Sequence, residues 1–259
     1  GEGKRGAEVA LARTTPPKDS LGGSISRLLL CPEDEAIVRS TMAEQFGADP
    51  DEISALAAKK ANTSYASDRD DAEFHLPAGM ARIVHALARK LSRRPLLNTP
   101  VTRISVNNGA VQISTSTAEV FAKRVIMAIP PPVARKVEFV TAHSDELYAL
   151  LSAFSDGAII KTTLVYDRAF WRTQGYSGAV TFAAPLGLEV RDTSYDTDEK
   201  PRLTAFLGGP EAKARARMSE DQREHLLLGE LSSALGEEAK HPCVIDEAIW
   251  VDHPWCGGG

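Results

Sequence analysis

A change of hydrophobic periodicity near residue 100 is the feature that most constrains the fold. Before it, residues 21–60 and 81–91 repeat apolar side chains every three or four positions, which is typical of amphipathic helices. After it, "VTRISV", "AVQISTS" and "AIIKTTLVYD" follow the period of two that strands require. Helices and strands do not alternate regularly. We therefore predict an α+β fold, with a mixed or antiparallel sheet and flanking helices, rather than a doubly wound parallel sheet.

Cap and turn residues set the limits of several elements. A helix beginning at Pro32 should end at Gly47, and a second helix should begin at Asp49 as its N-cap. The "NNG" at residues 107–109 predicts a β-hairpin. "VFAKRVIMAI" is predicted as a third strand, ended by the prolines that begin at Pro130.

Charge and cysteine content exclude several classes of function. The 259 residues carry a net charge of −5, which disfavours a broad nucleic-acid surface. No apolar run approaches the roughly 20 residues that span a membrane, and the first residues lack the apolar core of a signal peptide. The three cysteines are too few for a disulfide framework, so we expect a reducing cytoplasm.

The first six residues, "GEGKRG", match the G-x-G-x-x-G expression of a dinucleotide-binding turn at Gly1, Gly3 and Gly6. That turn works only between a buried strand and a helix, and no strand precedes it here. A flexible leader over residues 1–19 is the better interpretation.

Lys161 is the most unusual side chain in the strand pattern, because it interrupts the otherwise apolar and β-branched "AIIKTTLVYD". Alternation places it on one face with Ile159 and Thr163, opposite Ile160 and Leu164. If both faces are covered, the ammonium needs a partner, a water or a cofactor. If one face is wet, Lys161 is a solvated strand lysine, and the pattern leaves these alternatives about even.

Other candidate groups have ordinary structural explanations. A zinc site would need His241, Cys243, His253 and Cys256 to converge, but their spacing is unusual and we expect no metal. Trp250 could stack on a ligand or pack in the core.

Five stretches in this order resemble the flavin-dependent monoamine oxidase family. They are "FHLPAGMARIVHALARKL", "TPVTRISV", "VIMAIPPPVARKVEF", "GAIIKTTLVYDRAFWRTQGYSG" and "AIWVDHPWCGGG". The fourth is the most specific. The resemblance runs from about Ser20 to the end of the chain.

This resemblance implies an FAD enzyme that oxidises an amine by hydride transfer to the flavin, with oxygen then reduced to peroxide. Lys161 falls on the family lysine that holds a water near the flavin, so it is the expected catalytic residue. The positions that fall on FAD contacts are Val101, Ala128, Pro130 and Trp250. The positions that fall near the substrate cavity are Phe206 and Asp70.

The family's N-terminal dinucleotide-binding motif and its C-terminal FAD-binding block do not match any part of the sequence. We therefore expect a portion of an amine oxidase, incomplete alone. One explanation is that other chains supply the rest of the FAD site. The alternative is a non-catalytic binding module on the same scaffold, without flavin. A visible spectrum distinguishes the two.

The resemblance also implies a division of the chain into parts. Residues 20–78 and 143–249 would form the helices and sheet of the substrate domain. Residues 79–142 would belong to the FAD-binding domain, and residues 250–259 would begin the return to that domain.

Overall fold

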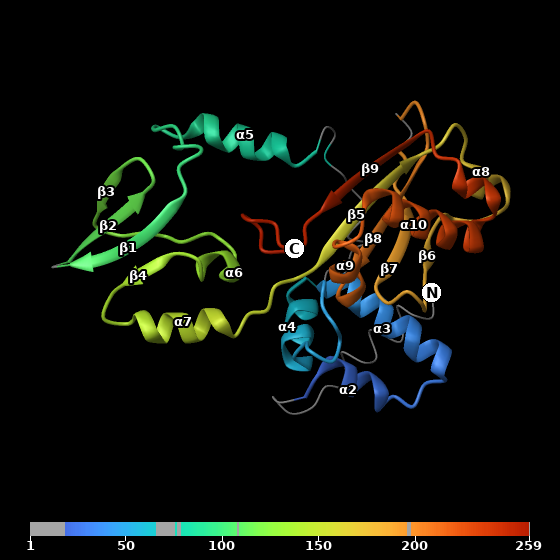
Figure 1. Cartoon of the computed structure of the whole chain (residues 1–259), viewed down its shortest axis with the longest axis horizontal. Helices are drawn as coiled ribbons and strands as arrows, with labels where there is room; N and C mark the ends of the chain where they lie inside the picture. The colour runs from blue at the N-terminus through green and yellow to red at the C-terminus, as the bar shows by residue number, and fades with distance from the viewer. Residues whose placement is uncertain (1–18, 66–75, 77–78, 108, 196–197, 259) are drawn as a thin grey trace. The chain divides into compact units, whose positions relative to one another are not determined.

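The computed structural model describes residues 19–65, 76, 79–107, 109–195 and 198–258, and these form two compact units (Figure 1). Unit 1 combines the chain up to Thr63 with Ser155–Gly259, and unit 2 is Ser64–Phe154. Each contains helices and its own sheet, so the predicted α+β class is confirmed. The glycines of "GEGKRG" and the candidate Asp70 lie outside the described residues.

A five-stranded antiparallel sheet forms the centre of unit 1. Its strands are β5 (Ile159–Val165), β6 (Val180–Thr181), β7 (Leu188–Asp192), β8 (Arg202–Gly208) and β9 (Val244–Ile249). Their order is β6-β7-β8-β5-β9, so β5 lies between β8 and β9 and is antiparallel to both. The short strand β7 was not predicted, although "LEV" carries the same alternation as its neighbours.

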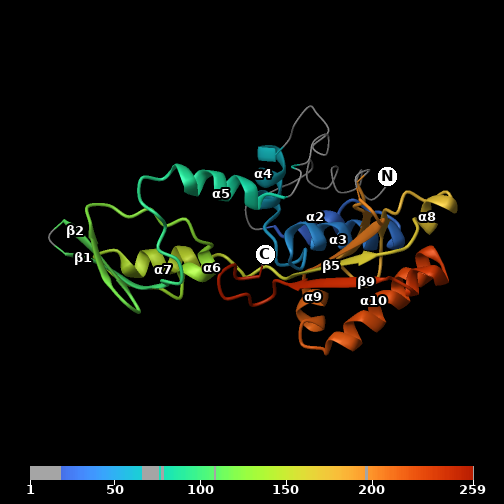
Figure 2. The same cartoon turned by 90° about the horizontal axis from the view of Figure 1, so that it is seen from above.

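The main core lies between one face of this sheet and the C-terminal helices. Helices α9 (Pro210–Arg215) and α10 (Glu220–Leu235) cover that face, followed by the 3-10 turn η1 (Glu237–Lys240) (Figure 2). Leu227, Leu231 and Leu235 of α10 pack on apolar side chains of β5, β7 and β8. The predicted start of α10 is confirmed, because Ser219 and Gln222 form a capping box there.

Helix α3 (Pro32–Phe46) packs on the opposite face, against β6, β7 and β8 (Figure 2). The backbones of α3 and β8 approach each other closely at Gly208, where an added Cβ would lie 2.5 Å from the carbonyl oxygen of Ala43. The hydroxyl of Ser40 accepts a hydrogen bond from the Gly187 backbone N–H at 2.8 Å, which fixes α3 to the turn before β7. The helix ends at Gly47 with φ of 60°, as predicted.

Two further helices, α2 (Leu21–Ser26) and α4 (Ala55–Tyr65), complete the N-terminal part of unit 1. Leu21, Ile25, Val38 and Met42 form a second small core between α2 and α3. The prediction that a helix begins at Asp49 was wrong. The Asp49 carboxylate instead accepts from the backbone N–H of Asp51 in a turn, and α4 begins only at Ala55.

Unit 2 holds a four-stranded mixed sheet of order β3-β2-β1-β4. Strands β1 (Val101–Asn107) and β2 (Ala110–Thr115) form the predicted antiparallel hairpin, with Gly109 at φ of 77° in its turn. Strand β4 (Glu138–Val140) is parallel to β1 and was not predicted. Helices α6 (Pro131–Ala134) and α7 (Ser144–Ser152) pack together beside this sheet.

The predicted third strand is much shorter than expected. Strand β3 covers only Glu119–Ala122, where it pairs with β2. Beyond it, among the described residues, the backbone has no strand partner, and Ile126 is 92% exposed. A run of apolar residues is therefore not enough to form a strand, because a strand also needs a neighbour to pair with.

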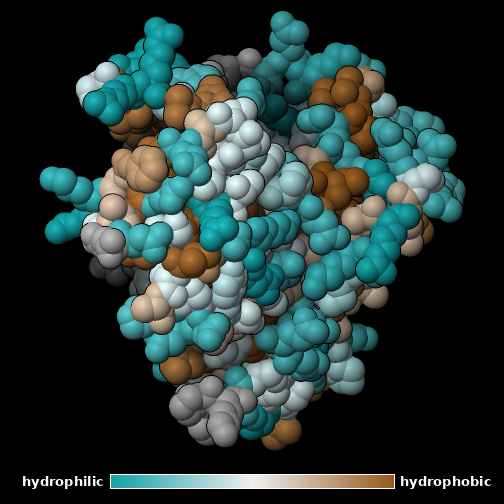
Figure 3. Space-filling model, turned by 60° about the vertical axis from the view of Figure 1, so that its left-hand side comes forward, coloured by the Kyte–Doolittle hydropathy of each residue, from teal (hydrophilic) through white to brown (hydrophobic). Residues whose placement is uncertain are grey.

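Helix α5 (Ala81–Lys90) forms as predicted, yet none of its residues is buried. The apolar side chains of Ile83 and Leu87 in this helix, and of Leu91 just after it, are all exposed in unit 2. Apolar patches are visible among polar side chains in the space-filling view (Figure 3). Among the described residues, no helix is long and apolar enough to cross a membrane.

The two units differ from the expected parts at three places. The first division falls after Thr63 rather than after residue 78, α7 belongs to unit 2 rather than to the unit of the larger sheet, and residues 250–259 belong to unit 1. The assignment of these parts to a substrate domain and an FAD-binding domain stays a prediction.

Candidate functional site

The structure brings together two of the predicted site residues, Lys161 and Phe206. They are directly opposite each other on β5 and β8. The Lys161 Nζ lies 5.6 Å from the centroid of the Phe206 ring, within the range of a cation–π contact. Both side chains lie on the sheet face that α3 covers only in part, opposite the face that holds the main core.

Lys161 is exposed in unit 1, so the structure of that unit agrees with the wet-face alternative. The predicted alternation is confirmed, since Ile160, Thr162 and Leu164 are buried and Lys161 is not. Its ammonium makes no hydrogen bond or ion pair with the described residues, and it lies against the Phe206 ring. An exposed cation beside an aromatic ring remains available to a ligand.

Two acidic side chains on the same face were missed by the sequence reasoning. Glu189 of β7 is opposite Phe206, on the side away from Lys161, and Arg191 binds its carboxylate at 2.9 Å. Burial, together with the nearby Glu189 carboxylate, raises the pKa of Glu44 on α3 to about 7, although Arg191 opposes this. The alternation of the overlooked strand β7 was a signal that could have found Glu189, but no local pattern places Glu44 beside it.

The second Glu189 oxygen, Oε2, is buried without a hydrogen-bond partner among the described residues. A protonated Glu44 carboxyl can donate to such an oxygen, whereas two charged carboxylates repel each other. The face therefore runs from a carboxyl pair at α3, through Phe206, to the exposed ammonium of Lys161.

Trp250 directly follows β9 and is 39% exposed. Its backbone N–H donates to the carbonyl of Ile159 at 2.9 Å, which continues the pairing of β9 with β5. Its ring lies 5.3 Å from the ring of His253. The side chain is thus available for stacking in unit 1, and it lies near the start of the strand that carries Lys161.

The remaining predicted FAD contacts lie in unit 2. Val101 begins β1 and is 38% exposed. Ala128 lies in the segment after β3, and Pro130 is the N-cap of the short helix α6. Unit 2 therefore carries these three candidates and unit 1 carries Lys161, Phe206 and Trp250.

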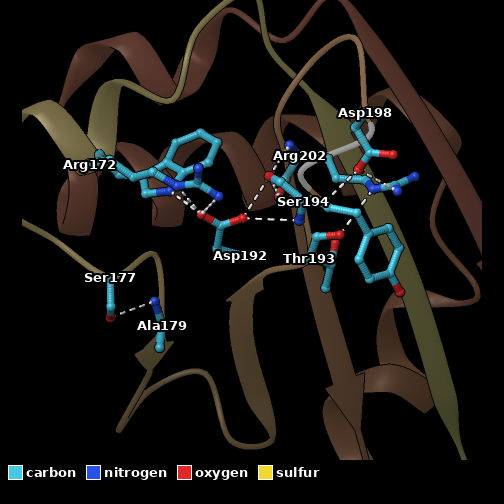
Figure 4. Close-up of polar contacts among 10 residues, drawn as sticks. Arg172, Ser177, Ala179, Asp192, Thr193, Ser194, Asp198 and Arg202 are labelled. Carbon is cyan, nitrogen blue, oxygen red and sulfur yellow. Dashed lines mark hydrogen bonds and ion pairs between the residues drawn. The ribbon is translucent and has the colours of Figure 1, made fainter. Parts of the chain in front are cut away.

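The last part of the most specific stretch, "FWRTQGYSG", is organised around Asp192 of β7 (Figure 4). Trp171 and Arg172 of helix α8 (Phe170–Thr173) donate to its Oδ2 at 2.8 and 2.7 Å, and Ser194 donates to its Oδ1 at 2.6 Å. Burial alone would raise the pKa of Asp192, but hydrogen bonds from Arg172, Ser194 and Trp171 lower it to about 2. This part of the stretch therefore secures α8 to the sheet.

The described residues contain no group of three or more side chains placed to hold a metal ion. Cys31, Cys243 and Cys256 are all free.

The chain is similar to known proteins in sequence and in fold. The profile of the family described as flavin containing amine oxidoreductase matches residues 16–259. A zebrafish (Danio rerio) flavin-containing amine oxidase is 30% identical over 191 residues, which cover 72% of this chain and 36% of that protein. An L-amino acid dehydrogenase from Synechocystis is 27% identical over 213 residues, covering 82% of this chain and 45% of that protein.

Among solved structures, cyclohexylamine oxidase from Brevibacterium oxydans superposes with a TM-score of 0.83. The superposition covers 99% of this chain and 61% of that chain, at 23% identity, and therefore shows a shared fold. The chain spans less than half the length of the two relatives that it matches in sequence.

Proposed function

We propose, from the premise that this chain belongs to the family of flavin-containing amine oxidoreductases, that it is a portion of an enzyme that oxidises the C–N bond of an amine. The observation that carries the proposal is the exposed Lys161 ammonium beside the Phe206 ring, on a sheet face that the core-forming helices leave open. A flavin and an amine would both use this face.

The residues of this face fit a planar, partly apolar group. An FAD bound in the complete enzyme supplies the hydride acceptor and the site at which oxygen is reduced. Lys161 would hold a water at its Nζ beside that group, because the described residues of the chain leave the ammonium without another hydrogen-bond acceptor. Trp250 would pack its exposed ring nearby.

Val101, Ala128 and Pro130 are proposed to contact FAD from unit 2. All three lie at the beginning of an element or in an extended segment, where a backbone N–H or carbonyl can face a ligand. The apolar side chains that unit 2 leaves exposed on α5 agree with a larger FAD-binding domain around it, to which other chains could contribute.

The substrate is proposed to be a small amine that enters beside Phe206. An aromatic ring attracts a substrate ammonium through its face and also offers apolar area to the carbon chain. Primary amines, polyamines and amino acids all remain within this class. Asp70 is retained as a substrate contact, and a reducing cytoplasm is the proposed location.

A non-catalytic binding module on the same scaffold is the second candidate. Lys161 is as exposed as an ordinary lysine on the solvent face of a strand. This exposure favours the non-catalytic module. The two functions predict different behaviour of the purified protein, examined together with any chains that purify with it.

The experiment is a visible spectrum followed by an amine assay. An enzyme shows flavin absorbance, as purified or after addition of FAD, and the absorbance bleaches anaerobically when an amine is added. In air, the same amine yields hydrogen peroxide. A protein that stays colourless with added FAD and releases no peroxide with primary amines, polyamines or amino acids would exclude the enzymatic function for this chain and its partners.

A further inference from the structure

Three segments of unit 1 meet at the end of β5 because of the strand order. Since β5 is antiparallel to both of its neighbours, its last residue, Val165, is opposite the first residue of β8 and the first residue of β9. The residues just outside these strands are therefore brought together. They are Asp167 after β5, Lys200 before β8 and Cys243 before β9.

The side chains of these three residues are in contact. The Lys200 Nζ donates to the Asp167 Oδ1 at 2.8 Å and to the Cys243 Sγ at 3.7 Å. The backbone of Cys243 is held in place, because its N–H donates to the Val165 carbonyl at 2.7 Å. The long stem of Lys200 gives its ammonium freedom to move toward the sulfur.

All three groups are accessible to small molecules. Cys243 is exposed, and the side chains of Lys200 and Asp167 are 49% and 79% exposed. Cysteines that react with peroxide are typically solvent-accessible and lie next to a cationic group. Cys243 meets both conditions, because it is exposed and its sulfur accepts from the Lys200 ammonium.

We propose that Cys243 and Lys200 form a covalent sulfur–nitrogen crosslink when the protein is exposed to hydrogen peroxide. In the first step, the Cys243 sulfur attacks one peroxide oxygen. The S–O bond forms, the O–O bond breaks, the thiol proton leaves with the departing oxygen as water, and the thiol becomes a sulfenic acid.

In the second step, the Lys200 nitrogen displaces the sulfenic oxygen. Lys200 first releases one proton to the solvent, the N–S bond forms as the S–O bond breaks, and the departing hydroxide takes a second proton from the same nitrogen to leave as water. The sum is one thiol, one amine and one peroxide giving one sulfenamide and two waters. The ion pair with Asp167 keeps the pKa of Lys200 above its usual range, which keeps the amine protonated and slows this step.

The crosslink would join the starts of β8 and β9 across the end of β5. Such a bond is reducible by thiols, so it would be a reversible mark of peroxide exposure rather than permanent damage. Peroxide is the product of the function proposed above, but this inference does not depend on that function, because the oxidant can be added to the protein directly.

The test is peptide mapping by mass spectrometry after treatment with hydrogen peroxide and alkylation of the remaining thiols. The expected result is a peptide pair joined through residues 200 and 243, lighter than the two free peptides by two hydrogen atoms. Dithiothreitol should separate the pair. The pair should be absent from Lys200→Met and from Cys243→Ser.

Matched variants exclude effects of general oxidation. Lys240→Met removes another exposed lysine of unit 1, which pairs with Glu237 instead, and should leave the crosslink unchanged. Cys31→Ser and Cys256→Ser should also leave it unchanged. Circular dichroism verifies that each variant is folded.

Three results would overturn the proposal. The first is peroxide-treated protein in which Cys243 carries only sulfinic or sulfonic acid, or a disulfide to a second chain. The second is a crosslink that retains an oxygen atom, because condensation expels it. The third is a crosslink at Cys243 that persists in Lys200→Met.

Discussion

The Lys161 ammonium and the Phe206 ring are directly opposite each other on neighbouring antiparallel strands, with the nitrogen 5.6 Å from the ring centroid. The strand register alone fixes this relationship, since both positions lie on the face that is not used by the main core. The pair therefore does not depend on loops for its geometry, and it gives the first prediction.

Replacement of Phe206 by Leu should weaken amine binding, because leucine keeps apolar area but has no ring face for a cation. We expect KM for the amine to rise about two- to fivefold, the effect of one exposed cation–π contact. The reaction of the reduced enzyme with oxygen should be unchanged. Phe206→Tyr keeps the ring and serves as the control. A rise in KM of the same size in both variants would argue against a role for the ring face.

The carboxyl pair of Glu44 and Glu189 predicts a dependence of stability on pH. The pKa of Glu44 is raised from 4.5 to about 7 in the folded protein, so the folded state binds more protons than the unfolded state between these values. The extra proton on Glu44 therefore stabilises the folded state. Its contribution to the free energy of unfolding is fully present below about pH 4.5 and is lost as the pH rises through about 7.

Glu44→Gln should therefore remove this fall in stability and be more stable than the original protein at pH 8. The measurement is urea denaturation at several pH values between 5 and 8. Glu33→Gln, an exposed position on the same helix, should keep the original pH dependence. If Glu44→Gln and Glu33→Gln showed the same slope against pH, the shared-proton interpretation would fail.

Alanine variants at Gly178 and Gly175 allow the cost of a steric contact to be measured apart from the cost of backbone strain. The φ of Gly178 is +81°, and an added Cβ would lie 2.8 Å from the Cβ of Asp192 and 2.9 Å from the Trp171 Nε1. Gly175 has nearly the same φ, +83°, with nothing within 4 Å. In both alanine variants, the free energy of unfolding should fall by about 1–2 kcal/mol, because alanine is strained in the left-handed backbone conformation.

The free energy of unfolding should fall further in Gly178→Ala than in Gly175→Ala, because the methyl group at residue 178 also disturbs the hydrogen bonds of Asp192. The difference in free energy of unfolding between the two variants, measured by denaturation, isolates that contact. Equal losses in the two variants would mean that the Asp192 contacts tolerate the methyl group.

Local patterns predicted much of the fold. The hairpin around Gly109, the end of α3 at Gly47 and the capping box at Ser219 all depend on neighbours in the sequence. The predictions that failed depend on strand pairing between segments that are far apart in the sequence. The segment after Ala122 is rich in apolar residues but has no strand partner among the described residues, and β4 was missed although it pairs with β1.

The site was predictable only in part for the same reason. Period two placed Lys161 on the correct face, but it could not show which strand lies beside it or that α3 covers only part of that face. The proximity of Phe206 comes from the register of β8, and that of Glu44 comes from helix packing. Neither the strand register nor the helix packing can be deduced from neighbouring residues in the sequence. The acidic pair was therefore not predicted.

The central claim is that Lys161 acts in the oxidation of amines by a bound flavin. The most direct measurement is stopped-flow spectroscopy of both half-reactions, in the flavin-loaded enzyme with its partner chains. In Lys161→Met we expect reoxidation of the flavin by oxygen to slow by about a hundredfold, the effect of removing one preorganised donor. Reduction by the amine should slow much less.

Lys213→Met, on helix α9 of the covered face, is the control and should change neither rate. An equal slowing of both half-reactions in Lys161→Met, or no change in reoxidation, would contradict the claim.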